Sequence, residues 1–390
     1  ALKIPRIQLK NYDYTQRLMT DEFVKIKLVV YNYFEPKGGF FILTESEKKA
    51  GKIEVKGFTP AVHTGDLVGR GMDLINQMTP NTSLTFDDPE LEAAVRHTLE
   101  KTGEPLTPTD VSGLINLSAS RREIVSLGGI EQLFVLQTFH AMGNRISKLH
   151  GLEGAFQLQE LNLSHNSIVE LDCLSGLTTL RRLHLGRNRI SNLQPLAELK
   201  NLRDLVLSYN QITGIEVLEG LTDLEELHLI GNQITDLSVL AKLTKLRILS
   251  LSHNQIDNLQ PLAGLTNLER LWIKGNQIKD LAPLAGLSNL RLLNLGANRL
   301  QEIHPLRKLT KLHELDLSEN QVEGIEDLKE MAELKVLLLS DNRVKEIDVL
   351  RNFPDLAIVE LSRNPLNLTG DPVVRNIIQL LVAEGRLVKP

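Results

Sequence analysis

Leucine and isoleucine recur through much of the chain in one fixed frame, which is clearest from residue 158 onward. The frame is L-x-x-L-x-L-x-x-N-x-I-x-x-L-x-x-L-x-x-L-x-x, and it repeats every 22 residues. A period that holds through ten successive steps is an internal repeat, so the pattern predicts a solenoid of stacked coils. The asparagine of the frame recurs at Asn144, Asn166, Asn188, Asn210, Asn232, Asn254, Asn276, Asn298, Asn320, Asn342 and Asn364.

The L-x-x-L-x-L segment predicts one short strand in each coil, because its residues alternate between apolar and polar. In the coil that begins at residue 158, Leu161 and Leu163 point inward, whereas Glu160 and Asn162 point outward. A single coil cannot bury its apolar face, so the strands of successive coils should form a parallel sheet with a spacing of about 4.8 Å.

The rest of each coil has to lead the chain back to the next strand. The asparagine falls where the chain leaves the strand, and we expect its buried amide to hydrogen-bond backbone groups of its own and adjacent coils. A structural role follows, since a buried amide without partners costs about 1–3 kcal/mol. Proline in the return arm predicts an extended or 3₁₀ conformation there. These prolines are Pro195, Pro261, Pro283 and Pro305.

Helices are predicted at both ends of the repeats. Residues 87–100 form a helix with Asp88 as its cap and Pro89 in its first turn, and residues 107–110 open a second helix with a capping-box pattern. An incomplete coil follows, with Arg122 at the asparagine position. Residues 371–384 form a helix at the other end. These elements would cover the open ends of the apolar core.

The repeat resembles the leucine-rich repeat family, in the 22-residue class found in bacterial internalins and in the phosphatase-regulator type. The two helices and the incomplete coil are similar to the internalin N-terminal cap. The resemblance implies an α/β repeat solenoid: a right-handed leucine-rich repeat superhelix with a parallel concave β-sheet and helical caps. It also implies a secreted or cell-surface protein, although the residues themselves leave the compartment open, cytoplasm included.

The first 84 residues lie outside the repeat and depart from the internalin pattern. Ten of the 16 aromatic residues fall within residues 1–86, and residues 1–84 carry a net charge of +3. Alternating and β-branched segments predict strands at residues 23–34, 40–44 and 52–58, hence a small β-rich domain. The predicted organisation is a β-rich domain (1–84), a helical cap with a half-coil (85–125), the repeats (126–366) and a C-terminal capping helix (367–390).

Composition removes several classes of function. The chain carries 44 basic and 49 acidic residues, so no basic field indicates nucleic acid. No apolar run reaches the ~18 residues of a membrane span. The single cysteine, Cys173, excludes an internal disulfide, and its convex position favours a packed thiol over a reactive one.

The outward positions of the predicted strands define the candidate functional site, the concave face. Solenoids use this extended surface for binding, and its composition fits a protein partner. Trp272 stands beside Arg270 and Lys274, the pairing of an aromatic anchor with cations that binding hot spots favour. Alternatively, Trp272 only packs against its outward neighbours. The residues predicted to bind protein are His140, Glu160, Arg182, His184, Asp204, Glu226, His228, Ile230, Ile248, Arg270, Trp272, Lys274, Leu292 and Asp316.

Three histidines on this face suggest a metal, but their spacing argues against a shared ion. His140, His184 and His228 stand two coils apart, so neighbours are separated by about 10 Å. Zinc holds its ligands about 2 Å away, so these three cannot bind one ion. The sequence predicts no metal site and no cofactor.

Three hypotheses for function result. The first is a monomeric, non-enzymatic module that binds a protein partner on the concave face, with no nucleic acid and no membrane span. The second assigns ligand binding or catalysis to residues 1–84, where His63, Asp66 and Arg70 lie in a glycine-rich stretch that can cradle phosphate. The third is a phosphatase-regulator-like subunit, which the repeat length permits.

Overall fold

The computed structural model describes residues 41–43, 46–49, 52–55, 58–60 and 83–389. The chain divides into two compact units, residues 1–69 and residues 70–390. The domain boundaries predicted from the sequence, after residues 84, 125 and 366, stay predictions.

The described part of the first unit consists of two antiparallel strand pairs. Strand β1 (Phe41–Leu43) pairs with β4 (Phe58–Pro60), and β2 (Ser46–Lys49) pairs with β3 (Lys52–Val55). The strand predicted at residues 40–44 is therefore confirmed as β1.

The strand predicted at residues 52–58 is confirmed over Lys52–Val55 as β3, but its last residue, Phe58, begins β4 and belongs to a different pair. Strand β2 is not expected from the sequence, since its residues Ser-Glu-Lys-Lys show no apolar alternation. The strand predicted at residues 23–34 and the group of His63, Asp66 and Arg70 lie outside the described residues.

The second unit contains a parallel sheet of 13 strands that stand side by side in chain order. From β6 to β16, the middle residue of each three-residue strand is buried and pairs with the middle residue of the next strand, as Leu249 does with Leu271. The strands are β5 (Asn116–Ser118), β6 (Thr138–His140), β7 (Glu160–Asn162), β8 (Arg182–His184), β9 (Asp204–Val206), β10 (Glu226–His228), β11 (Ile248–Ser250), β12 (Arg270–Trp272), β13 (Leu292–Asn294), β14 (Glu314–Asp316), β15 (Val336–Leu338), β16 (Ile358–Glu360) and β17 (Leu387–Lys389).

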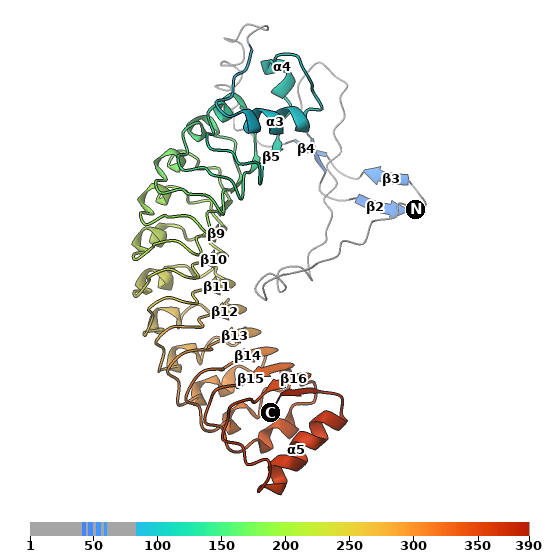
Figure 1. Cartoon of the computed structure of the whole chain (residues 1–390), viewed down its shortest axis with the longest axis vertical. Coiled ribbons are helices and arrows are strands. Elements are labelled where there is room, and N and C mark those ends of the chain that lie inside the picture. The colour runs from blue at the N-terminus through green and yellow to red at the C-terminus, as the bar shows by residue number, and fades with distance from the viewer. Residues whose placement is uncertain (1–40, 44–45, 50–51, 56–57, 61–82, 390) are drawn as a thin grey trace. The chain divides into compact units, whose positions relative to one another are not determined.

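Short 3₁₀ helices lie on the opposite side of each coil from the strands. Figure 1 shows the strands along the inner side of the curved solenoid and the 3₁₀ turns along its outer side. The four return-arm prolines all lie in the first turn of such a helix, as predicted. Proline has no N–H, and a nitrogen in the first turn has no hydrogen-bond partner within the helix. The 3₁₀ helices are Ile130–Gln132, Leu152–Gly154, Asp172–Leu174, Gln194–Leu196, Glu216–Gly220, Ser238–Lys242, Gln260–Leu262, Ala282–Leu284, His304–Lys308, Glu326–Leu328 and Asp348–Asn352.

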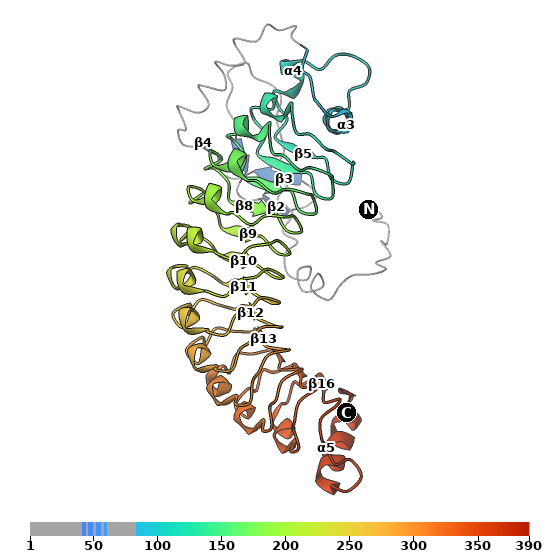
Figure 2. The same cartoon turned by 60° about the vertical axis from the view of Figure 1, so that its left-hand side comes forward.

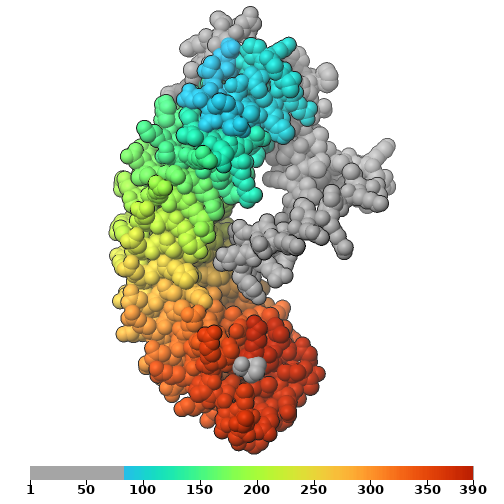
Figure 3. All heavy atoms as spheres, viewed as in Figure 1, coloured from blue at the N-terminus to red at the C-terminus, as the bar shows by residue number. Residues whose placement is uncertain are grey.

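One continuous apolar core runs through the coils. Leucine and isoleucine from the strand, the turn and the 3₁₀ helix of each coil are fully buried against those of the next. Figure 2 shows the coils as successive layers, and Figure 3 shows them packed without gaps along the solenoid. Because each strand pairs residue for residue with the next, the sheet is in straight register and its inner surface is regular.

The asparagines join successive coils. The Nδ2 of Asn254 donates to Leu229 O at 2.9 Å and to Leu251 O at 3.0 Å, and its Oδ1 accepts from Ile234 N at 3.0 Å. The frame from Asn166 to Asn342 repeats these bonds. Each amide thus satisfies backbone groups of its own coil and of the preceding coil. These bonds join the turn that follows one strand to the turn that follows the preceding strand.

The N-terminal cap begins with α3 (Pro89–Thr98) and α4 (Pro108–Val111). Asp88 caps α3 as predicted, since its Oδ1 accepts from Glu90 N at 2.9 Å. Its Oδ2 also accepts from Val125 N at 2.7 Å, so the same carboxylate fastens the cap helix to the first coil.

The C-terminal cap is α5 (Pro372–Ala383), capped by Asp371, whose Oδ1 accepts from Val373 N at 2.8 Å. Its buried residues Val374, Ile377 and Leu381 face the core of the last coils. The chain then returns as β17, which pairs with β16 and extends the sheet by one strand that the sequence does not predict.

Candidate functional site on the concave sheet

The concave face is built from the first and third residues of each strand. Since the register is one residue to one residue, these positions form straight columns across the sheet, with Glu226 beside Ile248 and His228 beside Ser250. Every residue predicted to bind protein lies on a strand from β6 to β14, or two residues after one, as Ile230 and Lys274 do.

Burial along these columns is uneven. Most of the predicted residues are partly exposed, and Arg182 is exposed. Leu292 is the exception, because its side chain retains only 7% exposure. Leu292 occupies the outward first position of β13, so it offers much less surface to a partner than its neighbours in the column do.

Glu160 is the centre of a charged group at the N-terminal part of the face. His140 Nε2 lies 2.9 Å from Glu160 Oε1, and Arg182 Nε donates to Glu160 Oε2 at 2.9 Å. The hydrogen bond from His140, followed by that from Arg182, lowers the pKa of the Glu160 carboxyl to about 2. Glu160 thus joins His140 and Arg182 by hydrogen bonds across strands β6, β7 and β8.

This group predicts a pH dependence of stability. A carboxyl whose pKa falls on folding stabilises the fold above its unfolded value of 4.5, and the contribution disappears as the pH falls from there through about 2. Glu160→Gln should therefore lower the free energy of unfolding by about 1 kcal/mol at pH 7, and the deficit should vanish near pH 2. Urea denaturation across this pH range measures it, with Glu170→Gln, an exposed residue of the same coil, as the control. A deficit that does not change with pH would rule out the charged group as its cause.

A second group, more buried, lies at the middle of the face. His184 Nε2 is 2.9 Å from Asp204 Oδ2, and His228 Nδ1 is 2.9 Å from Ser250 Oγ. Asp204, Glu226 and His228 each bring one oxygen or nitrogen to within 4.8 Å of the others. The second oxygen of Asp204, Oδ1, is buried and has no hydrogen-bond partner among the described residues.

Burial and like charge shift the titration of this second group. Burial and the neighbouring Asp204 carboxylate raise the pKa of Glu226. Burial lowers the pKa of His228. The arrangement thus brings two carboxyls and an imidazole together at one place on the sheet.

The patch around Trp272 lies next to this group. Trp272 and Arg270 occupy the third and first positions of β12, and both side chains are partly buried. Lys274 Nζ contacts Glu319 Oε1 at 3.3 Å. In the register Trp272 stands between Ser250 and Asn294.

The group of Asp204, Glu226 and His228 is not expected from the sequence, because only the spacing between histidines is considered there. The signal is nonetheless present in the repeat: Asp204 and Glu226 occupy the same position of successive strands, and His228 stands two residues after Glu226. A comparison of all metal-binding residue types across both columns would find it.

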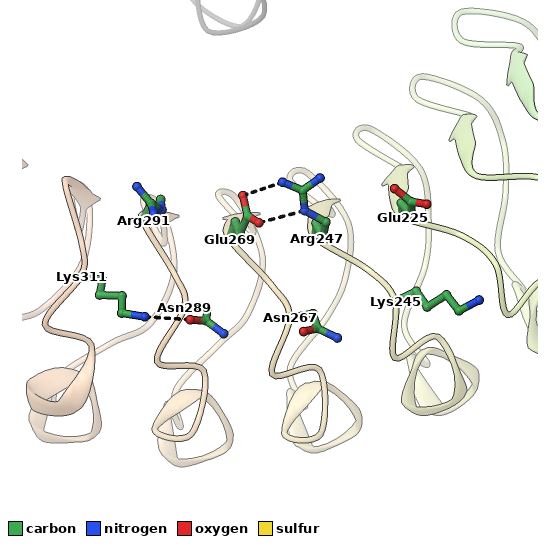
Figure 4. A pocket seen from close by; sticks show the side chains of 8 residues that line it. All are labelled: Glu225, Lys245, Arg247, Asn267, Glu269, Asn289, Arg291 and Lys311. Carbon is green, nitrogen blue, oxygen red and sulfur yellow. Dashed lines mark hydrogen bonds and ion pairs between the residues drawn. The ribbon is translucent and has the colours of Figure 1, made fainter. Parts of the chain in front are cut away.

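A polar groove of about 440 Å³ runs along the side of the sheet, where the chain approaches the strands (Figure 4). Two contacts join residues of its lining: Arg247 Nε donates to Glu269 Oε1 at 2.8 Å, and Lys311 Nζ donates to Asn289 Oδ1 at 2.9 Å. These contacts join neighbouring coils, and the groove is open and lined by polar and charged side chains.

Cys173 lies on the outer side of the solenoid. Its Sγ donates to Glu153 Oε1 at 3.2 Å. Burial, followed by this carboxylate, raises the pKa of the thiol to about 11, so the sulfur is protonated at neutral pH.

In the described part of the chain, none of the helices has the length and apolar character needed to cross a bilayer.

The repeat, the stacked parallel strands and the 3₁₀ return arms define a leucine-rich repeat protein. The family model for leucine-rich repeats (2 copies) matches residues 157–198, 200–242, 244–286 and 288–330. Proteins of this class are in general interaction scaffolds rather than enzymes. Curated protein sequences contain no match to the chain.

Solved structures similar to this chain include bacterial leucine-rich repeat proteins, among them internalins. An internalin, InlF, from Listeria monocytogenes is 30% identical, with a TM-score of 0.66 over 75% of this chain and 92% of that one. The functional domain of InlJ from the same organism is 24% identical, with a TM-score of 0.65 over 74% of this chain and 68% of that one. The leucine-rich repeat protein LIC12759 of Leptospira interrogans is 23% identical, with a TM-score of 0.61 over 71% of this chain and 75% of that one. The chain belongs to the internalin family of bacterial leucine-rich repeat proteins.

Proposed function

We propose that this protein is a non-enzymatic binding module that holds a protein partner on the concave face of its repeats. Its family supports this, because leucine-rich repeat proteins are interaction scaffolds. The columns from β6 to β14 support it as well, since they mix charged, polar and apolar side chains that remain partly exposed. Such a mixture fits a protein partner better than a nucleic acid, which would need a continuous basic stripe.

The observation that carries the proposal is Trp272. It is the one tryptophan of the chain, and it lies partly exposed on the concave face, between Ser250 and Asn294 in the register. Arg270 shares its strand, and Lys274 follows two residues later. Tryptophan and arginine contribute disproportionately to binding energy when a partner covers them. We therefore place the centre of the interface at β12.

The test compares variants for capture of the same partner. The tagged full chain is incubated with host-cell and bacterial lysates, and the retained proteins are identified by mass spectrometry. A retained protein is then purified and titrated against wild type and against the double variant Trp272→Ala with Arg270→Ala. We expect the double variant to bind at least ~30-fold more weakly, the equivalent of about 2 kcal/mol, with an unchanged melting temperature.

A matched control distinguishes the face from the protein as a whole. Phe156 is a large apolar residue with 48% exposure that follows the 3₁₀ helix Leu152–Gly154, away from the concave columns. Phe156→Ala should leave the affinity unchanged. Equal binding by wild type and by the Trp272 and Arg270 double variant would place the interface elsewhere.

A further inference from the structure

Asp204, Glu226 and His228 meet on the concave face in a way that suits a metal ion. Asp204 begins β9, and Glu226 and His228 flank the buried middle residue of β10, the neighbouring strand. One ligand atom from each lies within 4.8 Å of the others. A first-row metal ion binds oxygen and nitrogen at about 2.0–2.2 Å, so ligand atoms around one ion lie about 3–4 Å apart. The three side chains need only small rotations to reach that geometry.

An unsatisfied oxygen points to the same ion. Asp204 Oδ1 is buried and accepts no hydrogen bond from any described residue, whereas Oδ2 receives the bond from His184 Nε2. A buried carboxylate oxygen without a partner is unfavourable by about 1–3 kcal/mol or more, so native proteins pair nearly all such atoms. A cation between Asp204 and Glu226 would satisfy this oxygen and cancel the repulsion between the two carboxylates.

The side chains behind these ligands orient them as they do in known metal sites. Metal-binding carboxylates and imidazoles are held by a second hydrogen bond that fixes the ring and the carboxylate plane. Here His184 holds Asp204 Oδ2, and the Ser250 hydroxyl, which is 2% exposed, holds His228 Nδ1. His228 Nε2 has no hydrogen bond within the described residues and carries the lone pair once Nδ1 donates to the serine.

We propose that Asp204, Glu226 and His228 form a site for a divalent transition metal, with Zn²⁺ as the ion that fits best. One imidazole nitrogen and two carboxylate oxygens match the ligand preferences of zinc, whereas calcium and magnesium prefer oxygen alone. Three protein ligands leave a fourth position open, as zinc sites that bind an exchangeable ligand do. The face of the sheet supplies that opening, about two strand spacings, or ~10 Å, from Trp272.

This site does not depend on the proposed protein partner, so it can be tested with the metal alone. The full chain is stripped with EDTA, dialysed, and titrated with ZnCl₂ by calorimetry. A second titration with CoCl₂ is followed by visible absorption, because bound Co²⁺ gives d–d bands whose intensity reports the coordination number. We expect one equivalent of Zn²⁺ to bind with a micromolar or tighter Kd, and Co²⁺ to show the intense bands of a four- or five-coordinate site with a nitrogen ligand.

Variants identify the ligands. Glu226→Gln and His228→Ala should each weaken Zn²⁺ binding at least 100-fold, and Ser250→Ala should weaken it 10- to 100-fold through the loss of ring orientation. Glu226→Gln is isosteric and removes one of two like charges, so the metal-free variant should melt at or above the temperature of wild type. That result separates loss of a ligand from loss of folding.

The control is His140→Gln, because His140 belongs to the other histidine–carboxylate pair of the face, in which Arg182 already neutralises Glu160. It should bind Zn²⁺ as wild type does. The proposal is overturned if wild type takes up no stoichiometric Zn²⁺, or if Glu226→Gln and His228→Ala bind it as tightly as wild type, which would mean adventitious binding elsewhere.

Discussion

Leu249→Ala is expected to lower the free energy of unfolding by about 2–5 kcal/mol. Leu249 is the middle residue of β11, has no exposed surface, and pairs with Leu227 on one side and Leu271 on the other. Removal of its side chain leaves a cavity that the neighbouring coils cannot close, because their own strands hold them in register. Guanidinium denaturation followed by circular dichroism measures the loss.

The same strand supplies the control for this experiment. Ile248 precedes Leu249 and points to the concave side, where it is partly exposed. Ile248→Ala should therefore cost less than half as much as Leu249→Ala. Equal losses at the two positions would contradict the assignment of inward and outward faces. Because each coil is stabilised by its neighbours, the loss of Leu249 from the middle coil should also separate unfolding into two steps.

Asn254→Ala is expected to lower the free energy of unfolding by about 3 kcal/mol, although it removes no apolar surface. The three carbonyls to which Asn254 donates each keep another donor. Leu229 O accepts from Asn232, and Leu251 O accepts from Asn276. Ser252 O accepts from Gly231 N. The N–H of Ile234, in contrast, bonds to Asn254 Oδ1 and loses its partner inside the core. This one buried donor accounts for the largest part of the expected loss.

Asn267→Ala is the comparison for this prediction. Asn267 is exposed at the side of the sheet, and its Nδ2 donates to Thr244 O at 2.9 Å. Water can replace that bond, so the variant should lose less than about 1 kcal/mol. If both asparagine variants lose the same stability, the ladder of buried amides does not hold the coils together in the way the hydrogen bonds indicate.

The repeat explains why so much of the fold can be predicted from the sequence. A position that must be leucine in one coil must be leucine in every coil, because each stacks on the next, so the pattern reveals inward and outward faces without knowledge of the structure. The capping motif at Asp88 and the helix after Asp371 are predicted for the same local reason, a cap residue followed by proline. Strands β2 and β17 are not, since their pairing partners rather than their own residues make them strands.

The candidate site is predictable only in part. The register places Trp272, Arg270 and the other outward residues in columns, which follows from strand periodicity. It does not say that Leu292 is buried, since this depends on the side chains that lean over it. Nor does it say which charged neighbours bond to each other: Glu160 is bonded to His140 and Arg182, whereas Glu226 has no such partners.

The sequence by itself determined the solenoid, its caps, its asparagine ladder and the set of side chains on the concave face. These follow from a period and from local motifs, which act over a few residues and recur in every coil. Only the tertiary structure decided how those side chains meet, because contacts between residues about 20 apart in the chain depend on rotamers, burial and competing partners. Asp204, Glu226 and His228 come together for that reason, on strands whose spacing the repeat sets and whose side-chain contacts it leaves open.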